Sequence, residues 1–78
     1  MSPALDTMLT RDAVAAALTD AGFPVSAATL ATKATRGGGP AYRLFGRRPL
    51  YCWSDALEWA RGRLSAPIAN TSAAERAA

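Results

Sequence analysis

Large apolar side chains are scarce in this chain, and this scarcity limits what it can fold into. Half of its 78 residues are hydrophobic, but 19 residues are alanine, which buries little apolar surface. A chain of this length buries only roughly 60% of its unfolded surface. We therefore predict one small domain, with a core built from the larger side chains Val14, Leu18, Phe23, Val25, Leu30, Leu44, Phe45, Leu50, Trp53, Leu57, Trp59 and Leu64.

The side chains that most enzymes use are also scarce. There is no histidine, and Cys52 is the only cysteine, so a disulfide or a cysteine-based zinc site cannot form within the chain. We expect no enzyme activity, no catalytic residue, no metal and no cofactor. The sequence has no run of 18 apolar residues and no signal-peptide pattern, which predicts a protein of a reducing cytoplasm with no membrane partner.

Positive charge is concentrated in the middle of the chain. Residues 33–48 contain five cations and no acid, whereas the remaining residues contain four arginines and six acids. A solvent-exposed face usually mixes both signs, so this stretch predicts a surface that binds a polyanion, most often nucleic acid. The alternative is a solubilising surface with no partner. The five cations are Lys33, Arg36, Arg43, Arg47 and Arg48.

Two helix starts precede the cationic stretch. Thr10 is placed to cap a helix of about residues 11–21, which Gly22 ends, and Ser26 is placed to cap a second helix over Ala27–Thr35. Apolar residues before and after each cap are spaced as hydrophobic staples. Two short helices joined by a tight turn indicate a helix-turn-helix, and the alternative is an ordinary pair of packed helices in a bundle.

After the glycines at 37–39 the pattern changes to two short β-rich runs, residues 42–45 and 49–53. They predict a hairpin with Arg47 and Arg48 at its tip, and with an edge strand at Pro49. Ser54 is placed to cap a last helix that ends near residue 63 or 64. We expect residues 1–8 and 65–78 to be flexible. The predicted fold is α+β, mainly α.

Several segments, taken in order, carry a family resemblance. They are Leu9-Thr10-Arg11 with Ala13-Val14-Ala15, Val25-Ser26 with Thr29-Leu30, Gly39-Pro40 with Tyr42, Phe45-Gly46-Arg47-Arg48, Tyr51, and Ser54-Asp55 with Trp59. Over residues 9–64 the chain resembles the excisionase-type, MerR-like winged helix-turn-helix proteins of bacteria and mobile elements. This resemblance implies a helix-turn-helix, a two-stranded β-hairpin wing and a packing helix.

The resemblance and the chemistry of the residues together predict a DNA-binding site. A recognition helix in the major groove presents the side chains of its first turns to base edges, and arginines at a wing tip reach the phosphate backbone or the minor groove. The predicted recognition-helix residues are Ser26, Ala27, Ala28, Thr29, Thr32, Lys33 and Arg36. The predicted wing residues are Arg43, Arg47 and Arg48.

The predicted recognition helix departs from the family pattern, because it consists largely of alanine and threonine instead of large polar or aromatic residues. Neither residue gives the bidentate base contact of arginine or asparagine. A single copy is therefore expected to read sequence weakly, so that specificity needs further copies on DNA or a partner protein. Cooperative assembly and DNA bending are what the resemblance implies.

The resemblance implies a non-catalytic protein that binds double-stranded DNA in the bacterial cytoplasm, associated with the nucleoid. The leading role is an excisionase, or recombination directionality factor, which bends DNA so that an integrase excises a mobile element. A small transcriptional regulator on the same fold is the alternative. A third, from another class, is a protein-interaction adaptor such as an antirepressor. No coiled coil follows Leu64, so we expect no small-molecule ligand.

Overall fold

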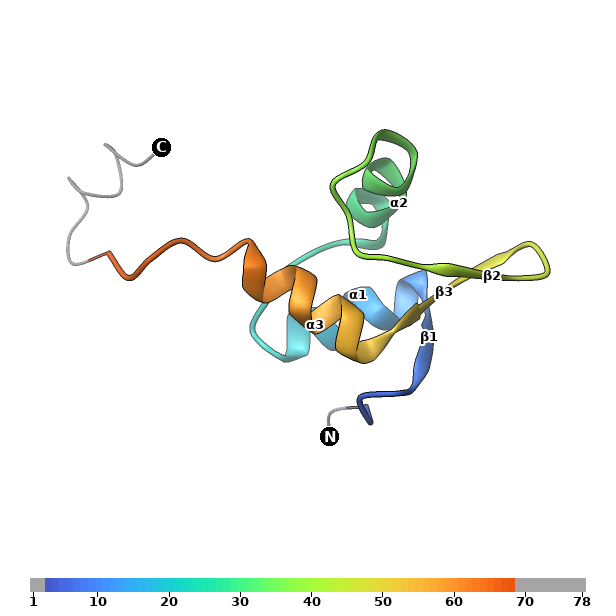
Figure 1. The fold of residues 1–78 in the computed structure, drawn as a ribbon, viewed down its shortest axis with the longest axis horizontal. Helices are drawn as coiled ribbons and strands as arrows, with labels where there is room; N and C mark the ends of the chain where they lie inside the picture. Colours follow the sequence, from blue (N-terminus) through green and yellow to red (C-terminus); the bar gives the residue numbers. More distant parts are fainter. Residues whose placement is uncertain (1–2, 69–78) are drawn as a thin grey trace.

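The computed structural model describes residues 3–68 as an α+β fold with three helices and one antiparallel sheet (Figure 1). The elements are β1 (Met8–Thr10), α1 (Arg11–Asp20), α2 (Ala27–Arg36), β2 (Arg43–Phe45), β3 (Arg48–Cys52) and α3 (Trp53–Gly62). The helices α1 and α3 pack against each other, and α2 lies to one side of them. The β2–β3 hairpin extends away from the helices.

The starts of α1 and α2 confirm the capping predictions. The Thr10 side chain accepts a hydrogen bond from the amide of Ala13 at 3.2 Å, and Ser26 accepts one from Thr29 at 3.1 Å. Each bond satisfies an amide that has no partner inside its own helix. Gly22 has a φ of 101°, a conformation that favours glycine, and it turns the chain between the two helices.

The predicted hairpin is also confirmed. In β2 and β3, Arg43 pairs with Leu50 and Phe45 pairs with Arg48, so that the loop contains only Gly46 and Arg47. Gly46 has a φ of 67°, as the first loop residue of a type II′ turn requires. The second loop residue, Arg47, is therefore held at the tip of the hairpin.

A third strand was not predicted. β1 pairs with β3 from Met8 opposite Cys52 to Thr10 opposite Leu50, so β3 is the central strand and Met8 does not belong to a flexible segment. Three residues are too few to show a strand period, so β1 could not be predicted from its residue pattern. Since β1 ends opposite Leu50, β3 has only one neighbour at Pro49, where the missing amide is tolerated.

The predicted cap of α3 is wrong. The helix begins at Trp53, and its N-cap is Cys52, which makes no side-chain capping bond. The first amides of α3 are instead satisfied by carbonyls that precede β1. Trp53 N donates to Thr7 O at 3.0 Å, and Ser54 N donates to Leu5 O at 2.9 Å. A segment distant in the sequence therefore replaces the serine cap.

The core is smaller than predicted and is filled partly by small residues. Leu44, Phe45 and Leu64 were predicted core residues, but they are 65%, 76% and 65% exposed. Leu44 and Phe45 lie on the part of the hairpin that extends beyond the helices, and Leu64 follows the end of α3. The buried hydrophobic residues are Val14, Ala15, Leu18, Leu30, Tyr51, Trp53, Ala56 and Ala60.

Residues 65–68 are exposed and form no helix or strand, and the rest of the predicted tail lies outside the described residues. In residues 3–68 no helix has the length and apolar character needed to cross a membrane.

Replacing Ser26 with alanine tests the cap of α2. Ser26→Ala removes the acceptor for the Thr29 amide and should lower the free energy of unfolding by about 1 kcal/mol in urea denaturation. Ser54→Ala is the matched control, since Ser54 caps no helix, and it should leave stability nearly unchanged. Equal losses in the two variants would contradict this assignment of the caps.

Candidate nucleic-acid interface

One face of α2 is turned away from the rest of the protein. Leu30 is the buried residue of this helix, and the helical period places Ala28, Thr32 and Arg36 on the side opposite to it. These three side chains and Thr35 are exposed. The outward face therefore consists mainly of small side chains, with an arginine at the C-terminal end of the helix.

Two threonines of α2, Thr32 and Thr35, donate their hydroxyl protons within the helix. Thr32 Oγ1 donates to Ala28 O at 3.1 Å, and Thr35 Oγ1 donates to Ala31 O at 3.3 Å. Each of these side chains then presents the lone pairs of its hydroxyl oxygen and its methyl group to the outside. Such groups match base amino groups and the thymine methyl group in the major groove of DNA.

A hollow lies where α1, α2 and β3 meet. It brings together three predicted site residues, Ala27 and Ala28 of α2 and Arg48 of the hairpin. Arg11 also lines this hollow, although it was not among the predicted site residues. The lining residues are Thr10, Arg11, Asp12, Ala27, Ala28, Ala31, Arg48 and Pro49.

Arg11 is held in place by Tyr51. Its Nε donates to the tyrosine hydroxyl at 3.0 Å, and its guanidinium carbon lies 5.9 Å from the centre of the ring. Tyrosine is neutral, so the contact fixes the guanidinium without cancelling its charge, although Asp12 also lines the hollow. A cation in the first turn opposes the helix dipole, and this is the sequence signal that could have identified Arg11.

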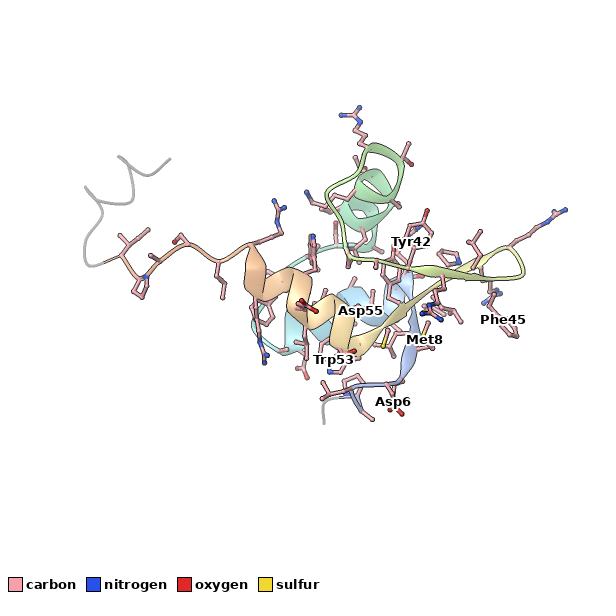
Figure 2. The ribbon with its side chains drawn as sticks, viewed as in Figure 1. Asp6, Met8, Tyr42, Phe45, Trp53 and Asp55 are labelled. Atoms are coloured by element: carbon pink, nitrogen blue, oxygen red, sulfur yellow. The ribbon has the colours of Figure 1, made fainter. Side chains whose placement is uncertain are left out.

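Because side chains alternate along a strand, the sheet register places Arg43, Phe45 and Arg48 on one face of the hairpin, and Arg47 in its loop. In Figure 2 Tyr42 lies on the side of the hairpin toward α2, and Phe45 lies on the other side. Arg43 is therefore on the face turned away from α2. Arg48 lines the hollow nevertheless, and Arg47 is exposed at the tip.

Thr29 and Lys33 do not face the hairpin. Both line a second hollow, on the other flank of α2, together with Trp59 and Arg63. Lys33 is half-buried there, and both residues also line a hollow on the outward face with Ala28 and Thr32. The Thr29 hydroxyl lies 2.9 Å from that of Ser26. Lys33 therefore does not share the hollow in which Arg48 lies, although both were predicted site residues.

The linker between α2 and β2 is fixed to α3. Trp59 Nε1 donates to Gly38 O at 2.8 Å, and Gly37 N donates to Lys33 O at 2.7 Å. Gly39 packs so closely on α2 that an added Cβ would lie 2.9 Å from the Cβ of Lys33. These contacts set the position of α2 relative to the hairpin. Trp59 was predicted as core, but it is only half-buried.

In the described part of the chain, no three histidine, cysteine, aspartate or glutamate side chains form a group that could hold a metal ion. Comparisons with family models, curated proteins and solved structures found no match to this chain. The resemblance drawn from the sequence therefore stays a prediction.

The close packing of Gly39 predicts that an added methyl group destabilises the protein at Gly39 but not at Gly62. Gly39→Ala should lower the free energy of unfolding by about 1–3 kcal/mol, because the new methyl group meets Lys33. Gly62→Ala is the control, since it adds the same group in open space, and it should not destabilise the protein. Urea denaturation measures both, and equal stability of the two variants would contradict the packing of the linker on α2.

Proposed function

We propose that the protein binds double-stranded DNA without catalysing a reaction, as a winged helix-turn-helix protein. In this proposal α2 is the recognition helix in the major groove, and the β2–β3 hairpin is the wing on the neighbouring backbone. The observation that carries the proposal is the hollow in which alanines of α2 meet Arg11 and Arg48. It supports a single surface that contains both a helix face and cations.

The residues around α2 fit the two kinds of contact that such a surface needs. The small outward side chains allow the helix to approach base edges closely, and arginines at its margins suit phosphates. Arg36 lies at the C-terminal end of the helix, Arg48 lines the hollow beside it, and Arg47 lies at the tip of the hairpin. Affinity then comes mainly from the backbone, and direct reading of bases is weak.

The exposed end of the hairpin favours an architectural role. Leu44 and Phe45 are strongly exposed, close in sequence to Arg47 and Arg48. Apolar side chains beside arginines are typical of proteins that enter the minor groove and bend the duplex. Together with the sequence resemblance, this supports the role of an excisionase, which bends DNA beside a recombination site so that an integrase excises the intervening element.

A gel shift across a range of salt concentrations tests DNA binding. If four or five cations contact phosphates, log K should fall against log salt with a slope of about −4 on duplexes of any sequence. Arg47→Ala with Arg48→Ala should weaken binding to all duplexes and reduce the slope to about −2, while Arg61→Ala, on the exposed side of α3, should change little.

A flat salt response with little binding would refute the proposal and favour a protein-interaction adaptor. Fluorophores at the two ends of a bound duplex report the bend. An unchanged distance between them on binding would exclude the excisionase role and leave simple DNA binding.

Thr32 lies at the centre of the outward face and tests whether α2 reads bases. Thr32→Val keeps the shape of the side chain but removes the oxygen that can accept from a base amino group. Competition between duplexes of different sequence should show a changed order of preference, by about 1 kcal/mol or more at the affected base pair. The same loss on every duplex would show that this position does not read sequence.

A further inference from the structure

We infer that the hollow on the flank of α2 away from the hairpin, here called the Trp59 groove, binds an acidic peptide segment of another protein, anchored by a large apolar side chain. The groove lies where the turn before α2, the side of α2 and the end of α3 meet. Its lining residues are Gly22, Phe23, Pro24, Val25, Thr29, Lys33, Trp59, Ala60, Arg63 and Leu64.

The walls of the groove are largely apolar. Phe23 and Val25 are half-buried on one side, and Leu64 is 65% exposed on the other. The volume of the groove is about 300 Å³, at the small end of ligand sites, so it admits a few side chains. Apolar walls of this kind suit a leucine or a phenylalanine and offer little to a DNA phosphate.

The charges at the groove have one sign. Lys33 and Arg63 are its two ionisable lining residues, and both are cations. The Arg63 guanidinium carbon lies 5.4 Å from the centre of the Trp59 ring, which holds the charge beside the apolar wall. An apolar anchor flanked by carboxylates complements this arrangement, because the anchor fills the groove while the acids meet the two cations.

Residues 69–78 of this chain do not complement the groove. They contain only alanine and polar residues, with one glutamate and one arginine, and therefore have no large apolar side chain to offer. The inference accordingly assigns the segment to another protein. The groove and the hollow that contains Arg48 lie on different flanks of α2. A peptide in the groove therefore leaves the hollow with Arg11 and Arg48 open.

Calorimetric titration of the full chain with a blocked peptide, Glu-Asp-Leu-Phe-Glu-Asp-Leu-Glu, tests this inference. We expect saturable binding of one peptide per chain. Arg63→Ala should weaken binding about two- to fivefold, as expected for an exposed charge contact. Arg61→Ala removes the same charge two residues earlier in the sequence but outside the groove, and it should leave binding unchanged. Leu64→Ser should also weaken binding, since Leu64 is exposed and its loss spares the core.

Three results would overturn the inference. Equal binding of a peptide with serine in place of leucine and phenylalanine would mean that charge alone drives the interaction. Equal losses in the Arg61 and Arg63 variants would mean the same. Displacement of the peptide by duplex DNA would make the groove part of a DNA surface. The peptide titration itself is measured without DNA, and only the displacement experiment adds it. Failure of the titration therefore leaves the proposed function standing, and a failed gel shift leaves the groove standing.

Discussion

The burial of Tyr51 in the central strand is the interaction that joins the hairpin to the helices. The side chain is 1% exposed and the residue lies opposite Leu9 of β1. Its ring packs at a tilt against that of Tyr42, with ring centres 5.7 Å apart. Its hydroxyl escapes the cost of burial without a partner because Arg11 donates to it. One residue therefore anchors the sheet in the core and fixes a cation in the hollow between α2 and the hairpin.

The parts of the fold that could be predicted from the sequence are those with local causes. Thr10 and Ser26 cap helices within three residues of themselves, and Gly46 sets its own turn, so these signals can be read along the chain. The strand β1 and the start of α3 depend instead on contacts more than 40 residues apart, such as Ser54 N with Leu5 O. A serine before a helix predicts a cap, but a carbonyl brought in by the fold can take its place.

The candidate site could be predicted as a capped helix and a group of cations, but their arrangement in space could not. The acid-free stretch contains Arg48, which lines the hollow with α2, and Lys33, which lines the groove on the other flank of α2. It also contains Arg43, which shares one face of the hairpin with Arg48 and Phe45. The burial of Leu30 sets the rotation of α2, and the hydrogen bond from Trp59 to Gly38 O fixes the linker after it. These two contacts decide on which flank of α2 each residue lies. Arg11 was missed because its partner is 40 residues away.

The composition of the chain connects the fold with the proposed chemistry. Because α2 consists largely of alanine and threonine, its inner face buries little apolar surface and its outer face has few side chains that can read bases. The position of the helix therefore depends on its contacts with α1 and the linker. If cations at its margins provide most of the affinity, binding is strong only at low salt and tolerant of sequence. Selective action then requires a second source of specificity, and a protein partner bound in the proposed Trp59 groove, which is lined by Lys33, Trp59 and Arg63, would provide it.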